Sequence, residues 1–573
     1  MSAATRRPGE PIDNLGIGVI VEVDGTHIIA ELDAGIAELS RVYGGVIYPI
    51  GQFGSIIRIH FGRRIIYGYV SRLRMKSDYE REKGIITAGS PSARIVEADL
   101  FGEGEWRWTT AKTPAVWELD FERGISSFPL PQQKVYLTPM TELAFIFGQR
   151  GKTAIEIGEH VGSGGAPAFA DLNELLGKHT AVLGSTGAGK SGTVAAILHC
   201  VLERGEQRGY TKWNPRIVLL DPHNEYGRAF DGHKRLSTDE GTLFLPYWLL
   251  NFQETIALLI GKTEFVATSQ ANIVKDALMV ARQEAAAKPV LNLDPQLLTV
   301  DSPVPYSLER FKALVEAKKP TQPSKQDKHN SILEKLDILR RDSRFSFMMQ
   351  EWDGASDPFN VVVGQFLGNG HPMRIVDLSG VPNEVAGAAS SAIARTLFSV
   401  KLWQTPDERE QNPILLVCEE AHRYVPNVGE AQYEAAQEAI RRLAKEGRKY
   451  GIGLMLVSQR PSEVEATVLS QCNSWIVLRI TNDTDREHVR AILPDSLSGL
   501  TKVLSGLRRR EAIFVGQATS LPSRVLIRLL QDNQLPRSQD VDFDAGWQHE
   551  QVDDALLIEI GNRWRCQQRK TLK

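Results

Sequence analysis

The sequence has little cysteine. Its 573 residues include four cysteines, and no two of them form a CxxC pair. They stand far apart, at Cys200, Cys418, Cys472 and Cys566. This spacing disfavours a structural zinc site and a disulfide framework. It fits a reducing compartment, so we predict a cytoplasmic protein.

Long apolar runs are also missing. No stretch approaches the roughly 18 to 20 apolar residues that a helix needs to cross a bilayer. The first residues, MSAATRRPGEP, lack the apolar centre of a signal peptide. We therefore expect neither secretion nor a role within the membrane.

An excess of positive charge is missing as well. The 67 basic and 70 acidic residues give a formal net charge of −3. This balance excludes a globally basic nucleic-acid binder, so any contact with a phosphate backbone must come from a local patch. A ring of subunits could build such a patch from a few residues per subunit.

The hydrophobic pattern changes along the chain. Short alternating segments such as IGVIVEVDG and IIRIHFG predict a small antiparallel barrel, which we place at residues 1–165. Apolar strands then alternate with longer helical stretches, which predicts an α/β fold with a mostly parallel sheet at 166–535. A helical insertion with a mobile polar loop interrupts it at about 250–355, and a polar tail or brace follows at 536–573.

The segment GSTGAGKS fits the phosphate-binding pattern GxxxxGK[ST]. An apolar strand precedes it and a helical stretch follows, so backbone N–H groups can converge on a phosphate at the positive end of a helix. Lys190 would reach the β- and γ-phosphates, and the Ser191 hydroxyl would ligate magnesium. The predicted nucleotide-binding residues are Gly184, Ser185, Thr186, Gly187, Ala188, Gly189, Lys190 and Ser191.

A phosphate-binding loop (P-loop) needs an acidic partner that holds the metal and orients the attacking water. In PILLVCEEAHRY, apolar residues run into two glutamates. Glu419 is placed to coordinate magnesium and Glu420 to act as the catalytic base. The alternative is a pair of solvated glutamates at a strand end.

Other polar residues also end apolar segments. Gln459 follows GLMLVS, where its amide could sense the γ-phosphate, or it could be a buried glutamine that bonds to backbone. Asp221 ends RIVLLD and is followed by Glu225; ligands of open α/β sheets collect at such strand ends. We therefore include Asp221 among the candidate catalytic residues.

Some P-loop NTPases complete their active site with an arginine supplied by another subunit. The helical segment that ends in EGRKYG offers Arg441, Arg442 and Arg448. We choose Arg448, which lies near the end of the segment, just before Gly451. Each arginine could instead be a solvated helix charge.

Taken in order, the segments HTAVLGSTGAGKS, LLDPHNEYG, LPYWLLNFQE, IVDLSG, EEAHRY, EGRKYGIGLMLVSQRPSEV and LRITNDTDREHVR resemble the HerA family of hexameric DNA translocases, relatives of FtsK and the VirB-type conjugation ATPases. The resemblance covers about 175–530, and the N-terminal barrel is similar in place to the family's HAS barrel. It implies that Lys190 and Ser191 bind nucleotide and metal and that Glu420 is the base. It also implies that Arg448 lies where a trans-acting arginine is plausible.

The sequence departs from the family's pattern at two positions. Glu419 stands where the family has aspartate, and Asn224 stands where it commonly has glycine.

The resemblance further implies a homo-oligomeric ring, usually of six subunits, with ATP and Mg²⁺ between subunits and DNA in the central channel. Arg508, Arg509 and Arg510, or the helical insertion, could line that channel, although three such arginines are more often a solvated loop. The family also implies a nuclease or sirtuin-like NADase partner, in DNA end processing or anti-phage defence. Two functions stay open: an ATP-driven DNA translocase or helicase, and an ATP-gated scaffold that activates its partner.

Overall fold

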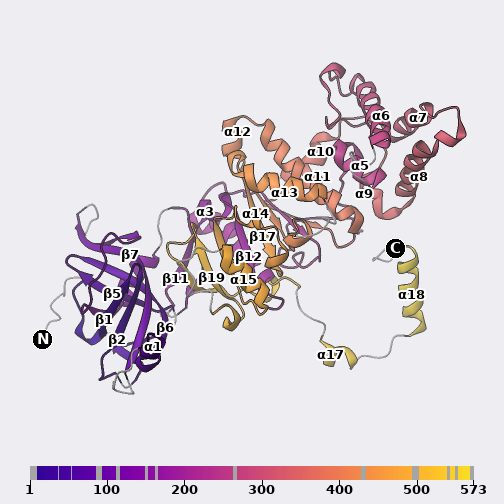
Figure 1. Cartoon of the computed structure of the whole chain (residues 1–573). Helices are drawn as coiled ribbons and strands as arrows, with labels where there is room; N and C mark the ends of the chain where they lie inside the picture. The colour runs from indigo at the N-terminus through magenta and orange to yellow at the C-terminus, as the bar shows by residue number, and fades with distance from the viewer. Residues whose placement is uncertain are drawn as a thin grey trace. The chain divides into compact units, whose positions relative to one another are not determined.

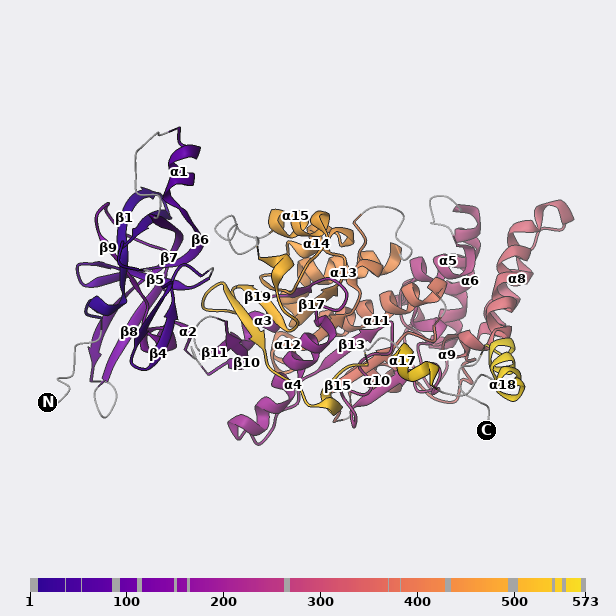
Figure 2. The same cartoon turned by 90° about the horizontal axis from the view of Figure 1, so that it is seen from below.

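The computed structural model describes residues 9–36, 38–52, 54–84, 93–110, 116–148, 152–161, 165–261, 268–368, 370–381, 383–427, 434–492, 503–537, 542–548 and 553–567. Figures 1 and 2 show the chain in two views. The chain divides into two compact units. Unit 1 comprises residues 1–175, 182–200 and 473–529. Unit 2 comprises residues 176–181, 201–472 and 530–573.

A closed antiparallel barrel forms the first part of unit 1, drawn in indigo in Figure 1. Its six strands pair in the order β2-β1-β9-β5-β6-β7, and β2 pairs again with β7. Alternating side chains fill its interior, which is rich in isoleucine and valine. The strands are β1 (Gly16–Asp24), β2 (His27–Leu32), β5 (Ile56–Phe61), β6 (Arg64–Met75), β7 (Arg94–Thr109) and β9 (Lys134–Leu137).

Smaller elements decorate the barrel. Strand β8 extends the sheet beyond β7, and β3 and β4 form a separate hairpin. Their bounds, with those of the accompanying helices, are η1 (Asp13–Leu15), β3 (Ser40–Tyr43), β4 (Val46–Pro49), α1 (Lys76–Glu82), β8 (Val116–Arg123) and α2 (Met140–Phe147).

The rest of unit 1 is built on a second run of antiparallel strands, in the order β11-β10-β20-β19-β18. The barrel strands end at Leu137, and β10 pairs with β20 although it precedes residue 165, the predicted end of the barrel domain. The elements are β10 (Ala154–His160), β11 (Pro167–Asp171), β18 (Ser474–Val477), α15 (Asp483–Ile492), η10 (Leu504–Gly506), β19 (Glu511–Gly516) and β20 (Ser523–Ile527).

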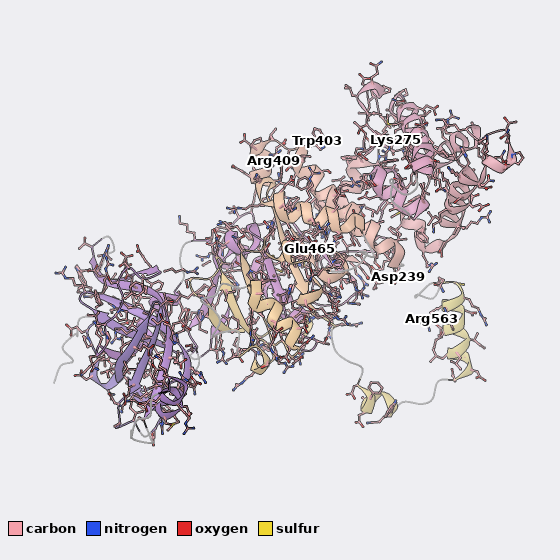
Figure 3. All side chains as sticks on the ribbon, viewed as in Figure 1. Asp239, Lys275, Trp403, Arg409, Glu465 and Arg563 are labelled. Carbon is pink, nitrogen blue, oxygen red and sulfur yellow. The ribbon has the colours of Figure 1, made fainter. Side chains whose placement is uncertain are left out.

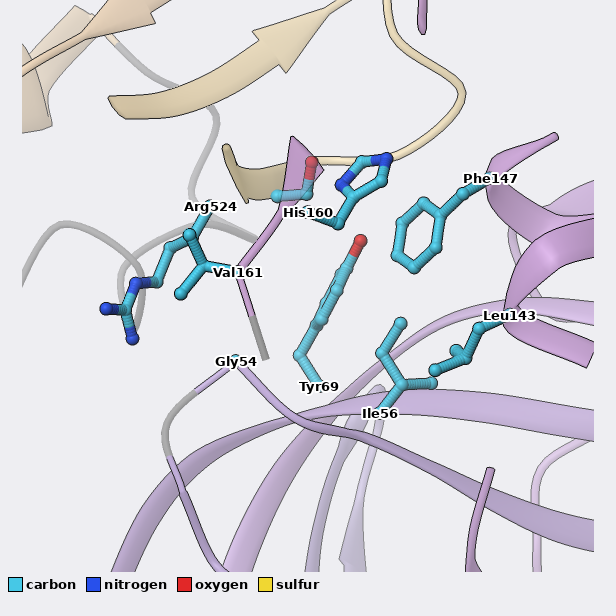
Figure 4. A pocket seen from close by; sticks show the side chains of 9 residues that line it. Gly54, Ile56, Tyr69, Leu143, Phe147, His160, Val161 and Arg524 are labelled. Atoms are coloured by element: carbon cyan, nitrogen blue, oxygen red, sulfur yellow. The ribbon is translucent and has the colours of Figure 1, made fainter. Parts of the chain in front are cut away.

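Within unit 1, residues of the barrel, of α2 and of the second run of strands line a small cavity (Figure 4). Tyr69 from the barrel, Phe147 from α2 and His160 from β10 line it, and the Phe147 and His160 rings stack with centroids 3.8 Å apart. Burial lowers the pKa of His160 to about 4, so the ring is neutral near pH 7. Nearby, the Arg123 guanidinium donates to the carbonyls of Thr519 and Ser520.

Unit 2 contains a parallel sheet, as the sequence predicts. Its strands follow the order β14-β15-β13-β16-β17, and β13, β15, β16 and β17 are buried at every position. Continuous burial explains their unbroken apolar sequences, because helices cover both faces of such sheets. Their bounds are β13 (Ile217–Asp221), β14 (Lys234–Ser237), β15 (Met373–Asp377), β16 (Ile414–Cys418) and β17 (Ile452–Ser458).

The predicted insertion is helical. Part of its polar run, expected as a mobile loop, is ordered, because α8 begins at Asp327 and buries Ile332, Leu333 and Leu336. The helices from residue 247 to 367 are η2 (Tyr247–Leu249), α5 (Phe252–Ile260), α6 (Thr268–Ala286), η3 (Pro295–Leu297), α7 (Leu308–Ala317), η4 (Pro323–Lys325), α8 (Asp327–Arg341), η5 (Ser343–Phe345), α9 (Ser346–Met349) and α10 (Phe359–Leu367).

The remaining helices of unit 2 follow in chain order. They are α11 (Asn383–Trp403), α12 (Pro406–Gln411), η6 (Ala421–Arg423), α13 (Glu434–Glu446), η7 (Gly447–Tyr450), η8 (Pro461–Glu463), α14 (Ala466–Leu469), η11 (Asp532–Gln534), α17 (Phe543–Trp547) and α18 (Asp554–Arg565). Three elements include residues of both units: α3 (Leu172–Gly177), β12 (Thr180–Leu183) and α4 (Lys190–Arg208). Within the described ranges, no helix is both long and apolar enough to cross a membrane.

A buried ion pair ties the barrel to α2 and gives a first prediction. Arg58 on β5 donates to Glu142, and both side chains are almost fully buried. Removing one partner of such a pair costs about 3 to 5 kcal/mol, because the other charge stays buried. We expect Glu142→Ala to lower the free energy of unfolding by about that much. Glu82→Ala, which removes an exposed partner of Arg74, should cost much less. Urea denaturation of both variants checks this, and equal losses would contradict it.

Candidate nucleotide-binding site

The predicted P-loop, residues 184–191, connects β12 to the long helix α4. Gly187 and Gly189 adopt φ values of +73° and +97°, which side chains disfavour. A Cβ at Gly184 would lie 2.9 Å from the Leu478 Cβ, so this position also has no room for a side chain. The glycines of the motif are therefore required by the backbone that the loop adopts.

Hydrogen bonds within the loop hold its backbone and the Lys190 side chain. The Ala188 N–H donates to the Ser185 carbonyl at 3.2 Å, and Lys190, which is largely buried, reaches back to the same carbonyl at 3.4 Å. Lys190 and Ser191 are the first residues of α4, where the helix dipole favours a bound anion. Thr186 and Gly187 are exposed. The loop can thus present backbone N–H groups and one ammonium to a phosphate.

The segment after β18 supports the P-loop from within unit 1. The Ser185 N–H donates to the Arg479 carbonyl at 2.8 Å, and the Thr481 N–H donates to the Ser185 hydroxyl at 3.1 Å. Arg486 fixes this segment by donating to the Thr481 carbonyl at 2.6 Å. The conformation of the loop therefore depends on residues nearly 300 positions further along the chain.

In unit 2, acidic residues gather at the carboxyl ends of the parallel strands. Asp221 ends β13 and stands in register with Asp377, which ends β15. Glu419 and Glu420 directly follow β16. All four side chains are at least nine-tenths buried. Because carboxylates are costly to bury without donors, each needs specific partners.

Asp221 organises the turn that follows it. Its carboxylate accepts backbone N–H groups from Tyr226 at 2.9 Å and His223 at 3.2 Å. Burial raises the pKa of Asp221 to about 6, and the nearby Asp377 adds to the rise. Asn224 lies in the same turn at φ +57°, a conformation that asparagine tolerates and glycine adopts freely. Asparagine at this position is therefore compatible with a left-handed backbone conformation that glycine would also adopt.

Tyr226 positions Glu419. Its buried hydroxyl donates to Glu419 Oε2 at 2.8 Å. Burial and the adjacent carboxylate raise the pKa of Tyr226, so the phenol keeps its proton. This hydrogen bond orients the longer side chain that replaces the aspartate of the family pattern.

Glu420 has an unusual backbone conformation. Its φ of +54° and ψ of +53° lie in the left-handed region, which costs a non-glycine residue roughly 1 to 3 kcal/mol. His422 Nδ1 lies 3.3 Å from the Glu420 carboxylate and 3.3 Å from the Ser458 hydroxyl. Burial lowers the pKa of His422 to about 4, so the contact with Glu420 involves a neutral imidazole near pH 7. Strain of this kind is concentrated at functional sites.

Gln459 follows directly after β17 and is half-buried. It therefore lies at the same strand edge as Asp221, Glu419 and Glu420. The structure brings these four predicted residues to one edge of unit 2, while the predicted phosphate-binding residues belong to unit 1.

The three candidate arginines differ in their contacts. Arg441 pairs with Glu465, labelled in Figure 3, at 2.6 Å. Arg442 lies over the Phe398 ring at 4.5 Å. Arg448 is exposed in η7, and its guanidinium has no ion pair or hydrogen bond within the described ranges. Of the three, Arg448 is thus the one whose charge no described residue of the chain takes up.

Several neighbours of the site were not predicted. Asp377 carried a signal, because it ends the apolar segment MRIVD just as Asp221 ends RIVLLD. It accepts hydrogen bonds from Arg235 at 2.7 Å and from the Ser379 hydroxyl at 2.7 Å. Tyr226 and His422 carried no such signal, because their roles depend on contacts across the fold.

Known proteins resemble this chain over much of its length. The family model described as "Helicase HerA, central domain" matches residues 155–397. A probable helicase of Methanocaldococcus jannaschii is 28% identical over 69% of this chain and 74% of its own length. The DNA double-strand break repair helicase HerA of Pyrococcus furiosus is 28% identical over 69% of this chain and 72% of its own.

A further relative and a solved structure extend the comparison. The DNA double-strand break repair helicase HerA of Saccharolobus solfataricus is 25% identical over 73% of this chain and 76% of its own length. The structure of VirB4 from Thermoanaerobacter pseudethanolicus has a TM-score of 0.48 and 17% identity, over 67% of this chain and 99% of that one.

The raised pKa of Asp221 predicts a dependence of stability on pH. The folded protein binds the proton of this group up to about pH 6, and the unfolded chain only up to about pH 4. The contribution of Asp221 to stability is therefore full at low pH and is lost as pH rises through 6. From pH 5 to 7.5, we expect the wild type to lose about 1.4 kcal/mol relative to Asp221→Asn. Urea titrations without nucleotide or metal measure this, and parallel curves for the two proteins would contradict it.

Proposed function

We propose that this chain, which belongs to the HerA family of P-loop ATPases, is an ATP-driven DNA translocase. Two features of the same chain carry the proposal: a complete P-loop in unit 1, and a strained glutamate directly after a parallel strand in unit 2. The first binds the phosphates of a nucleotide, and the second supplies a base for hydrolysis. The family match points to DNA as the molecule on which this energy is used.

In this proposal, each residue of the site has one role. Backbone N–H groups of residues 184–191 and the Lys190 ammonium hold the phosphates. Glu420 accepts a proton from the attacking water, and Gln459 senses the γ-phosphate. Asp221 acts through the turn that it organises.

The donors present fit magnesium. The Ser191 hydroxyl and the Glu419 carboxylate, oriented by Tyr226, are hard oxygen ligands of the kind that this ion prefers. Bound there, Mg²⁺ would neutralise charge on the phosphates.

We also propose a ring, six-membered as the family implies, in which Arg448 of one subunit reaches the nucleotide of the next. Arg448 is exposed and pairs with none of the residues that the structure describes, which supports this role. Because head-to-tail contacts can close into a cycle, one arginine per subunit completes every site.

The partner enzyme and the biological process are inferred from the family resemblance alone. We propose a partner enzyme, a nuclease or a sirtuin-like NADase, in DNA end processing or anti-phage defence. The cytoplasm stays the predicted location. An ATP-gated scaffold is the alternative function, and the response of ATP turnover to DNA distinguishes it from a motor.

The motor proposal predicts DNA-stimulated ATP hydrolysis. We expect duplex DNA to raise steady-state turnover several-fold, and DNA binding to weaken steeply with salt because phosphate contacts release counterions. Lys190→Ala should abolish nucleotide binding. Glu420→Gln should keep nucleotide binding and ring assembly but lose turnover. An ATP turnover rate that DNA leaves unchanged but a partner protein alters would favour the scaffold.

The trans role of Arg448 predicts complementation between inactive subunits. Arg448→Ala should lower kcat by about a thousandfold without changing the mass of the assembly, because the charge that develops on the γ-phosphate then lacks the arginine that stabilises it. Arg442→Ala, a matched exposed arginine, should stay close to the wild type. Mixed rings of Arg448→Ala and Lys190→Ala subunits should regain part of the activity, because each Lys190→Ala subunit still offers its Arg448 to a neighbour. No recovery on mixing would contradict a trans role.

A further inference from the structure

The arginine-rich turn at residues 508–510, one of two segments considered for a DNA channel, lies beside the P-loop of unit 1. We propose that Arg509 binds the phosphates of the nucleotide held by the P-loop of its own subunit. This inference rests on the proposed nucleotide binding and adds a cationic residue to it.

The turn is fixed by a buried carboxylate. Glu511, the first residue of β19, is almost fully buried. Its carboxylate accepts the Arg508 N–H at 3.0 Å and the Arg524 Nε at 2.9 Å. The backbone of the turn is therefore held from the side of β19 and β20.

Arg510 joins the turn to the P-loop. Its backbone has a φ of +68°, and its guanidinium donates to the Ile527 carbonyl at 2.6 Å. Its N–H points to the Ala188 carbonyl at 3.5 Å. Arg510 thus has a structural role, because its guanidinium is already hydrogen-bonded to a carbonyl of β20.

Arg509 begins directly over the P-loop. A Cβ placed on Gly189 would lie 3.7 Å from Arg509 Cγ, and Gly189 is the residue before Lys190. The guanidinium extends beyond that Cγ, so it can reach the space that the N–H groups of the loop face. Those groups cradle the α- and β-phosphates in P-loop proteins.

The charge of Arg509 is available for such a contact. The side chain is exposed and has no ion pair, hydrogen bond or ring contact among the residues that the structure describes. A guanidinium can bind phosphate oxygens through two parallel hydrogen bonds. Arg508 is also exposed, and no contact among the described residues brings its side chain to the loop, so it is a matched control.

The test measures the binding of fluorescent ADP and ATP analogues to the full-length wild type, Arg509→Ala and Arg508→Ala. Loss of a charged hydrogen bond should weaken both nucleotides roughly ten- to a hundredfold in Arg509→Ala, and Arg508→Ala should bind as the wild type does. Arg509→Lys should recover part of the affinity. Mass photometry and circular dichroism confirm that each variant is assembled and folded.

The outcomes separate the possible roles of Arg509. Unchanged nucleotide affinity with weakened DNA binding would overturn the proposal and place Arg509 in a channel. A loss for ATP alone would overturn the assignment to phosphates that ADP also carries. A wild type that binds neither nucleotide would contradict the proposed function itself, whereas normal wild-type binding with an unaffected Arg509→Ala variant contradicts only this inference.

Discussion

Burial of carboxylates at the ends of parallel strands is the constraint on which the candidate site depends. Asp221, Asp377, Glu419 and Glu420 are all largely removed from water. Such groups are tolerated only where donors meet them. The turn after β13, Arg235 and the Tyr226 hydroxyl supply donors to the first three. These donors fix the direction of these three acids, which a hydrolytic site requires before the nucleotide binds.

The P-loop is constrained in a different way. Its glycines permit the curve, but the segments around residues 478–481 and 508–510 hold it in place. Strand β19 leads away from the second of these segments, and the turn beyond its far end, at residues 516–520, accepts hydrogen bonds from Arg123 of the barrel. Within unit 1, one strand therefore links the surroundings of the P-loop to the barrel.

The sequence predicted the features that depend on local pattern. The alternating segments predicted the barrel, the unbroken apolar segments predicted β13, β16 and β17, and GSTGAGKS predicted a loop between a strand and a helix. Features set by distant contacts were not predictable. The left-handed backbone of Glu420 has no signature in EEAHRY, and Arg509 lies about 320 residues after Gly189. Arg508, Arg509 and Arg510 look alike in sequence, and only the fold gives them different surroundings.

Displacement of a triplex-forming strand tests the central claim most directly, because it detects movement along DNA rather than turnover alone. A labelled third strand is bound to one end of a duplex, and its release is followed after ATP is added. The account predicts release that requires ATP hydrolysis, that is absent in Glu420→Gln, and whose delay grows with the length of duplex between the loading end and the triplex. If DNA accelerates ATP hydrolysis but the third strand stays bound at every duplex length, the chain is not a translocase and the account is contradicted.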